Sequence, residues 1–252
     1  MFLFSGGFIR KIFIFFLIFL YPFFIYANGL LDSDLDGVPD NDEINIYFTD
    51  PNLRDTDHDG YSDWIELNSG FSPLDPRPIK LEDSDFDHDG LSDRMELNFK
   101  TNLKVKDSDG DGYSDGEEIK NFYDPLNSEK VKLKKRIEIN TGKQELYYFL
   151  GGVRMGTFII SSGVHGTTPL GHHVIRNKNI KAWSPYGLWM PYWMGLDNGR
   201  VGIHELPVWP NGYVEGENHL GRPVSHGCIR LGHKSAEFLY NWAEIGTEVF
   251  IY

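Results

Sequence analysis

The sequence predicts a mostly β domain, a sandwich or a barrel with one C-terminal helix, preceded by a loop-rich array of acidic repeats. Two observations predict this division. Residues 28–128 carry 27 Asp and Glu side chains against 8 Lys and Arg, whereas residues 129–252 carry 10 against 14. The first region repeats a short acidic pattern, and the second consists of short apolar and aromatic segments separated by glycine turns. The two regions are therefore expected to fold in different ways.

The first 27 residues have the layout of an export signal. Arg10 and Lys11 precede an apolar run of 14 residues, 12–25, and Ala27 follows closely. This order is typical of a secretory signal peptide, and the run is shorter than the roughly 20 residues of a spanning helix. We expect cleavage after Ala27, with an uncleaved membrane anchor as the alternative. Either form places the rest of the chain in the periplasm or cell envelope, with the N-terminal segment as the only expected contact with a membrane.

Four segments of residues 28–128 share one acidic template of twelve residues. Aspartates stand at positions 1, 3, 5 and 9, glycine at position 6 and glutamate at position 12. Calcium-binding loops have this pattern, because the acidic side chains supply oxygen ligands and the glycine permits a sharp turn. Four tandem copies favour a metal-binding array over a solvated acidic linker. The predicted Ca²⁺ ligands are Asp32, Asp34, Asp36, Asp40, Glu43, Asp55, Asp57, Asp59, Asp63, Glu66, Asp85, Asp87, Asp89, Asp93, Glu96, Asp107, Asp109, Asp111, Asp115 and Glu118.

The connections between these loops are too short for paired EF-hand helices. The first aspartates are 23, 30 and 22 residues apart, and prolines interrupt the connections. The array resembles thrombospondin type 3 repeats, which implies structural calcium in place of a large apolar core. Bound ions would offset the repulsion between carboxylates, so folding and metal binding are expected to form one equilibrium. The longest interval contains Pro73, Pro76 and Pro78 and is expected to be a stiff insertion between two repeat pairs.

The second region, 129–252, follows a basic junction with short predicted strands. The segment 136–140 alternates apolar and polar residues, and after a turn the segment 145–150 is rich in aromatic residues. Two glycines then precede a strand at 155–161, and further strands are expected as far as the C-terminus. One helix is expected at 235–244. This pattern is typical of a β-sandwich or a β-barrel.

The motif Ser225-His226-Gly227-Cys228-Ile229-Arg230 contains the only cysteine of the chain, so no internal disulfide can form. A cysteine reacts as a thiolate, which requires a base or a positive charge nearby and backbone donors for the oxyanion that it creates. The motif places such groups close to the thiol. A buried, inert thiol is the alternative.

This motif, Thr168-Pro169-Leu170-Gly171, Gly202-Ile203-His204 and Gly246-Thr247-Glu248-Val249 together resemble the L,D-transpeptidase (YkuD-type) catalytic domain over residues 132–252. The resemblance implies an exported enzyme that acts on peptidoglycan stem peptides. In that chemistry a cysteine attacks an L,D peptide bond, forms an acyl-enzyme and passes the acyl group to an amine or to water. Calcium is expected only in the repeats, and no cofactor is expected for catalysis.

The resemblance assigns roles to individual residues. Cys228 is the predicted nucleophile and His204 the predicted general base, with the backbone carbonyl of Glu205 orienting the imidazole ring. Backbone amides around Gly227 and Cys228 are expected to form the oxyanion hole. Glu205 stands where the family often has glycine, and its carboxylate is expected to raise the pKa of His204.

The remaining motif residues, Ser225, His226 and Arg230, are expected to belong to the site. His226 and Arg230 would shape it and meet a substrate carboxylate, because guanidinium groups suit carboxylate geometry. The loop 207–223 is longer than is common in the family. The aromatic stretch 183–193 is expected to form either a groove wall over the cysteine or part of the core.

Two other functions use the same features. An L,D-endopeptidase or carboxypeptidase would share the cysteine and the base and differ in the acceptor, which would be water. A calcium-dependent wall-binding protein without catalysis is the third candidate. Nucleic acid is not expected as a partner, because no basic stripe is present. Several other histidines lack regular spacing and are expected to be structural or exposed: His165, His172, His173, His219 and His233.

Overall fold

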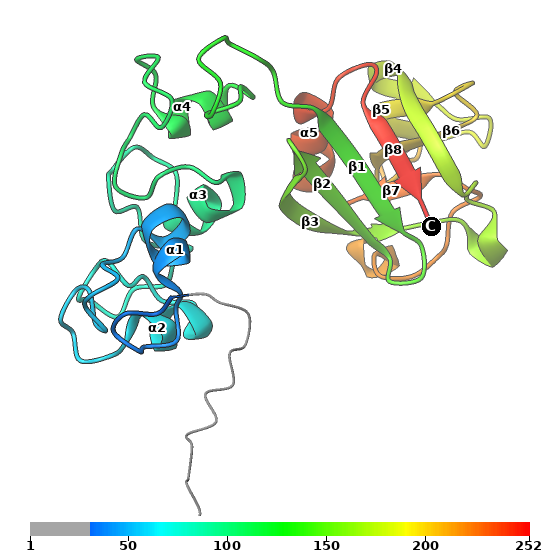
Figure 1. The fold of residues 1–252 in the computed structure, drawn as a ribbon. Coiled ribbons are helices and arrows are strands. Elements are labelled where there is room, and N and C mark those ends of the chain that lie inside the picture. Colours follow the sequence, from blue (N-terminus) through cyan, green and yellow to red (C-terminus); the bar gives the residue numbers. More distant parts are fainter. Residues whose placement is uncertain (1–30) are drawn as a thin grey trace, which may run out of the picture.

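The computed structural model describes residues 31–252, so the predicted signal segment, 1–27, lies outside the described residues. Figure 1 shows a loop-rich chain of short helices followed by a β-barrel. Within the described part of the chain, no helix has both the length and the apolar character needed to cross a bilayer. The predicted fold class, a mostly β domain preceded by loop-rich repeats, is confirmed.

Each acidic loop of the array leads into one short helix. Ser62 and Ser114 cap the helices that follow them, because their side chains accept hydrogen bonds from backbone amides of the first turn. Gly70 and Lys100 end two of the helices in the left-handed conformation. The helical elements are α1 Asp40–Asp42, the π-helical turn η1 Glu43–Tyr47, α2 Asp63–Ser69, α3 Asp93–Phe99 and α4 Asp115–Lys120.

Hydrogen bonds from backbone amides to aspartate carboxylates join the repeats in pairs. The amide of Trp64, in the second repeat, donates to Asp36 Oδ2 of the first at 2.9 Å. In the same way the amide of Gly116, in the fourth repeat, donates to Asp89 Oδ2 of the third at 2.6 Å. A Cβ atom at Gly116 would lie 2.6 Å from the Asp89 backbone oxygen, so this close approach requires glycine.

The second region is a closed barrel with the strand order β1-β2-β3-β7-β6-β5-β4-β8. Neighbouring strands are antiparallel except in the pairs β1–β8 and β6–β7, which are parallel. The strands are β1 Lys135–Asn140, β2 Glu145–Leu150, β3 Val153–Ser161, β4 Gly171–Trp183, β5 Trp189–Leu196, β6 Val201–Glu205, β7 Ile229–Leu231 and β8 Glu248–Ile251. Short 3₁₀ turns, η2 Val164–Gly166 and η3 Glu217–His219, lie in the loops.

The barrel interior and the helix α5 His233–Trp242 form the main core. In β1, Ile137 and Ile139 are fully buried, whereas the residues between and beside them are not, as the predicted alternation requires. Ala236 and Leu239 of α5 are also fully buried and pack in the same cluster. The helix contacts β5, β6 and β7, so it supports the strands that carry the cysteine motif.

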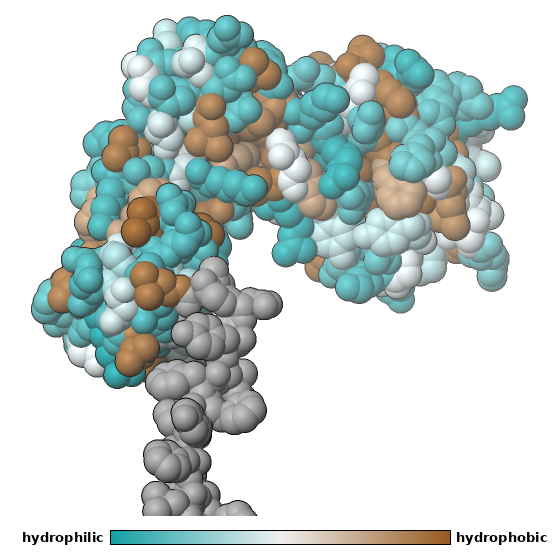
Figure 2. Space-filling model, in the orientation of Figure 1, coloured by the Kyte–Doolittle hydropathy of each residue, from teal (hydrophilic) through white to brown (hydrophobic). Residues whose placement is uncertain are grey.

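A second apolar cluster joins the array to the barrel. Leu91, Phe99 and Ile119 of the third and fourth repeats pack with Leu150 at the end of β2. Met155 of β3 also packs against this cluster. Figure 2 shows that hydrophilic residues cover most of the visible face of the array, with apolar residues in small groups. The last two repeats therefore use part of their limited apolar surface to hold the β2–β3 hairpin.

Truncation of this junction is expected to destabilise the protein. Leu150 is 1% exposed, so Leu150→Ala removes buried methyl groups and should lower the free energy of unfolding by about 2–5 kcal/mol. Urea unfolding of the full chain in the presence of calcium measures the loss. Leu170→Ala is the matched control, because Leu170 is 65% exposed and its change should stay within about 0.5 kcal/mol. Equal effects of the two substitutions would contradict the assignment of Leu150 to the apolar cluster that joins the array to the barrel.

Candidate active site and cation-binding loops

Parallel pairing of β6 with β7 brings His204 and Cys228 to one place. His204 lies opposite Arg230 in this pair, and Cys228 immediately precedes β7. Ile203 and Ile229 form the neighbouring pair and are fully buried, which anchors both strands in the core. Residues separated by more than twenty positions in the sequence therefore become neighbours in the sheet.

The His204 imidazole is held in one orientation. Its Nδ1 lies 2.5 Å from the backbone oxygen of Glu205, and because a carbonyl only accepts, Nδ1 carries the proton. The Nε2 atom is then free to accept a proton. His204 is 2% exposed, and its burial, together with the positive charge of Arg230, lowers its pKa to about 3. The ring is therefore a neutral base at physiological pH.

The Cys228 thiol is partly shielded from water. Burial raises its pKa, while a backbone hydrogen bond with Gly202 and the charge of Arg230 act in the opposite direction. The resting pair is consequently a neutral thiol beside a neutral imidazole. Three apolar residues pack beside the thiol: Leu188, Met190 and Trp193.

The thiol and the imidazole line one hollow of about 710 Å³. Its walls come from the β4–β5 hairpin, the β5–β6 turn, the long loop before β7 and the cysteine motif. The lining residues are Ala182, Trp183, Ser184, Pro185, Tyr186, Leu188, Met190, Trp193, Gly199, Arg200, His204, Pro207, Trp209, Glu215, His219, Val224, Ser225, His226, Cys228 and Arg230. A hollow with a nucleophile, a neutral base and several polar side chains suits covalent acyl transfer.

Comparison with known families agrees with this geometry. Residues 134–251, which contain the whole hollow, match the family model of the L,D-transpeptidase catalytic domain, YkuD. This part of the chain is therefore similar to L,D-transpeptidase catalytic domains. The family model of the bacterial TSP3 repeat matches residues 55–76 and 107–121, so the resemblance of the array is also confirmed.

Relatives of the transpeptidase domain occur in Bacillus subtilis (strain 168). A protein named as an L,D-transpeptidase, YkuD, is 30% identical over 119 residues, which cover 46% of this chain and 64% of that protein. A second, YciB, is 30% identical over 125 residues, with the same two coverages of 46% and 64%. The chain thus spans less than two thirds of the length of these relatives.

Solved structures include similar domains. An L,D-transpeptidase from Stackebrandtia nassauensis is 26% identical, with a TM-score of 0.41, and the match covers 48% of this chain and 57% of that chain. An L,D-transpeptidase from Mycobacterium tuberculosis H37Rv is 22% identical, with a TM-score of 0.42, covering 49% of this chain and 59% of that chain.

Ser225 forms two hydrogen bonds within the cysteine motif. Its Oγ donates to the Cys228 carbonyl at 2.6 Å and accepts from the Gly227 amide at 3.0 Å. Gly227 has a φ of 138°, in the region that favours glycine. The Gly227 amide is thus already engaged, and the oxyanion role predicted for it is not supported by this geometry.

Thr168 ties the cysteine motif to the loop between β3 and β4. Its Oγ1 donates to the Gly227 carbonyl at 2.9 Å and accepts from the Gly163 amide at 2.8 Å. The backbones are in contact here, since a Cβ atom at Gly163 would lie 2.8 Å from the Gly227 Cα. The sequence placed Thr168 in a family turn but gave it no task, because its partners are distant in the sequence.

Arg230 lines the hollow, but it is also paired within the protein, which the sequence did not predict. Its Nη1 donates to Glu215 Oε2 at 2.7 Å, and the same oxygen lies 3.1 Å from His219 Nδ1. Arg230 is 8% exposed, so this ion pair is largely removed from water. Glu215 belongs to the long loop before β7 and was missed by sequence reasoning. An acidic residue within a loop that lines a site was the available signal.

His226 lies at the rim of the hollow and is exposed. Its ring stacks on Tyr186, with centroids 4.3 Å apart and an angle of 14°. Tyr186 belongs to the aromatic stretch 183–193, which forms the end of the β4–β5 hairpin. The stretch fulfils both expectations, because Tyr186 and Trp183 line the hollow while other members pack in the interior.

The Glu205 carboxylate points away from the base. Its Oε1 lies 3.0 Å from His233 Nδ1, in agreement with the alternation of side chains along a strand. The prediction that Glu205 raises the pKa of His204 is wrong, because burial dominates and lowers it. The other histidines are scattered, and residues 31–252 contain no histidine cluster suited to a metal ion.

The four acidic loops of the array share one backbone conformation. The residue at position 4 and the glycine at position 6 have positive φ in every loop. The glycine amide donates to the aspartate at position 1, at distances between 2.8 and 3.3 Å. The chain therefore winds around its first carboxylate, with Gly37, Gly60, Gly90 and Gly112 at the turns.

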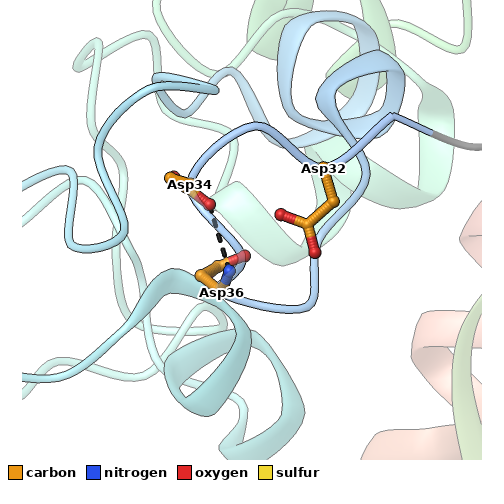
Figure 3. Close-up of side chains that lie close together, drawn as sticks. All are labelled: Asp32, Asp34 and Asp36. Carbon is orange, nitrogen blue, oxygen red and sulfur yellow. Dashed lines mark hydrogen bonds between the residues drawn. The ribbon is translucent and has the colours of Figure 1, made fainter. Parts of the chain in front are cut away.

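The acidic side chains of each loop converge. The aspartates at positions 1, 3 and 5 each place an oxygen within 4.8 Å of the others, and Figure 3 shows the first such group, Asp32, Asp34 and Asp36. The glutamate at position 12 is buried, and one of its oxygens has no hydrogen-bond partner. Burial and the neighbouring carboxylates raise the pKa of Glu66 and of Glu96 to about 8. This set of oxygens fits a hard cation such as Ca²⁺.

The aspartates at position 9 have a different task. Their oxygens accept hydrogen bonds, most often from the amide and hydroxyl at position 2: Asp63, for example, accepts from the Thr56 amide at 2.8 Å and from its hydroxyl at 2.7 Å. These hydrogen bonds hold each loop closed, and the role of these aspartates as direct ligands stays a prediction. The aspartates concerned are Asp40, Asp63, Asp93 and Asp115.

The thiol should become more reactive as pH rises. A raised thiol pKa means a smaller thiolate fraction at any given pH, so alkylation of Cys228 by iodoacetamide should accelerate by roughly tenfold per pH unit below that pKa. Intact-mass measurement of labelling from pH 5 to 9 provides the profile. Cys228→Ala is the control and should take no label, since it removes the only cysteine. A level rate between pH 5 and 8 would instead indicate a resting thiolate–imidazolium pair.

Proposed function

We propose that the protein is an exported peptidoglycan L,D-transpeptidase that acts through a Cys228 acyl-enzyme. The observation that carries the proposal is the fixed imidazole of His204 in the same hollow as the thiol. Its Nδ1 proton is held by the Glu205 carbonyl, which leaves Nε2 to accept a proton. The family of the domain supports the reaction class.

In the first half of the reaction, His204 Nε2 takes the thiol proton as Sγ attacks the carbonyl carbon of a stem-peptide bond. The carbonyl electrons move to oxygen and form a tetrahedral oxyanion. When this intermediate collapses, the bond from carbon to nitrogen breaks, and the leaving amine takes the proton from the imidazolium. The product is a thioester on Cys228 together with a neutral His204.

In the second half, an acceptor amine attacks the thioester and gives its proton to His204, and the thiolate that leaves is then reprotonated by the imidazolium. The enzyme returns to its starting state, and a new peptide bond has formed. Water as the acceptor would release a shortened stem peptide, so hydrolysis uses the same residues. Leu188, Met190 and Trp193 pack against the partly buried thiol, which reduces the access of water and favours transfer.

The array is proposed to bind calcium structurally and to act as a spacer, an anchor or an adhesion module. Support comes from the converging carboxylates and from the buried glutamate oxygens without partners. When bound, the ions would supply positive charge that offsets carboxylate repulsion within each loop. They take no part in the proposed reaction.

The base assignment separates two histidines. His204→Ala should lower the rate of Cys228 acylation by roughly 10²–10⁴-fold, because it removes the proton acceptor. His226→Ala should lower the rate by less than about tenfold, because His226 lies at the exposed rim. Mass spectrometry of the protein incubated with a carbapenem or a stem peptide measures the adduct. The reverse order of effects would identify His226 as the base. An adduct on Cys228→Ala would show that Cys228 is not the nucleophile and would contradict the proposed enzyme.

The acceptor is tested by product analysis. The mature chain is incubated with disaccharide-tetrapeptide, with and without calcium, and the products are identified by mass spectrometry. Cross-linked dimer is expected if an amine is the acceptor. A shortened stem without dimer would instead establish the hydrolase.

Calcium is expected to order the array. Added calcium should increase its circular dichroism signal and protect residues 28–128 from proteolysis, and chelator should reverse both changes. Glu66→Gln should raise the calcium concentration at the midpoint by roughly tenfold, because it removes a buried carboxylate ligand. Glu82→Gln is the matched control, since the Glu82 side chain is 60% exposed and lies outside the four acidic templates. Signals unchanged by calcium would contradict the metal-binding role.

A further inference from the structure

The hollow around Cys228 contains two guanidinium groups in different electrostatic states. Arg230 is paired with Glu215 at 2.7 Å, and their side chains are only 9% and 13% exposed. The carboxylate therefore offsets the charge of Arg230 inside the protein. The pair is close to neutral overall, so it attracts a second carboxylate less strongly than an unpaired guanidinium does.

Arg200 also lines the hollow, but it is exposed. Its guanidinium forms no ion pair within residues 31–252. The backbone that carries it is nevertheless firmly held. The Arg200 amide donates to Asn198 Oδ1 at 3.0 Å, and the Gly199 amide donates to the Leu196 carbonyl at 2.7 Å.

The turn that carries Arg200 is also tied to β4. Asp197 Oδ2 lies 2.6 Å from His173 Nδ1, and the amide of Asp197 donates to the Val174 carbonyl at 3.0 Å. A hydrogen-bonded turn that presents an unpaired guanidinium is suited to ligand binding, because its backbone loses little conformational freedom when the ligand arrives.

Arg200 lines the same hollow as the reacting groups. It immediately precedes β6 and lies four residues before His204. The next residue, Val201, approaches the cysteine motif, since its Cγ2 is 3.7 Å from the position of a Cβ atom at Gly227. A peptide bound across the thiol would therefore pass near the turn.

The charged and titratable groups that line the hollow are Arg200, Arg230, Glu215, His204, His219, His226, Tyr186 and Cys228. Glu215 contacts both Arg230 and His219, so its negative charge is already shared. The positive charge of Arg200 has no such counterpart. A planar guanidinium binds a carboxylate with two parallel hydrogen bonds, which selects this group over a neutral amide.

We infer that Arg200 is the specificity-determining residue that binds a free carboxylate of the donor peptide, while Glu215 offsets the charge of Arg230. The inference rests on the proposed function, because it names the group by which that same site selects its donor. The carboxylate has two sources in such a peptide: the C-terminus and an internal acidic group.

The test uses the purified full chain with calcium and three donor tetrapeptides: one with free carboxylates, one with a C-terminal amide and one with its internal carboxylates amidated. The second-order rate of Cys228 acylation is measured by intact mass. Wild-type protein should lose roughly 10- to 100-fold with one of the two amidated donors, and that donor identifies the source. Arg200→Gln should show the same loss with the free donor and no further loss with that amidated donor. Arg200→Lys should recover part of the rate.

Two controls make the outcome interpretable. Arg154→Gln, on the exposed part of β3, should leave all three rates unchanged. Alkylation of Cys228 by iodoacetamide should be equal in wild-type and Arg200→Gln protein, which verifies that the site is folded. Equal losses of Arg200→Gln with free and amidated donors, or no loss, would overturn the inference and leave the proposed function standing. Absence of acylation of the wild-type protein by every donor would overturn both.

Discussion

The parallel pairing of β6 with β7 is the interaction on which the site depends. It fixes His204 beside Arg230 and thereby beside Cys228, and the buried pair Ile203–Ile229 keeps the two strands in register. A shift of one residue would turn His204 out of the hollow, because side chains alternate between the two faces of a strand. The helix α5 packs against the same strands and maintains this register.

Side-chain hydrogen bonds of Ser225 and Thr168 fix the conformation of the cysteine motif. Ser225 closes the motif on itself, and Thr168 ties it to the β3–β4 loop. The close backbone approach at Gly163 and Gly227 leaves no room for side chains. These contacts place the thiol by backbone geometry, so the position of the nucleophile depends on residues that take no part in the proposed chemistry.

The array and the barrel are stabilised in different ways. The barrel buries a continuous apolar core, whereas the array is dominated by converging carboxylates with buried oxygens that lack partners. Oxygen atoms in this state favour a bound cation, so electrostatics takes the place that apolar burial has in the barrel. Ile119 and Leu150 belong to the apolar cluster in which the two regions meet.

Much of the fold was predictable because its signals are local. The alternation at 136–140, the aromatic strand at 145–150 and the helix at 235–244 follow from nearest-neighbour patterns, and the structure has β1, β2 and α5 within two residues of these bounds. The four acidic loops could also be predicted, since the carboxylates and the glycine of each loop come from one continuous segment of twelve residues. Errors arose where neighbours in space decide. Burial reversed the expected pKa shift of His204, and the hydrogen bonds of the aspartates at position 9 were not foreseen.

The sequence by itself determined the reactive motif around Cys228, the order of the two regions and the repeating ligand pattern. Each of these features consists of residues that are close together along the chain. The tertiary structure decided which groups the thiol faces. It joined Glu215 to Arg230, turned Glu205 toward His233 and left Arg200 unpaired in the hollow. Such contacts depend on strand register and on the path of long loops, which the sequence does not specify position by position.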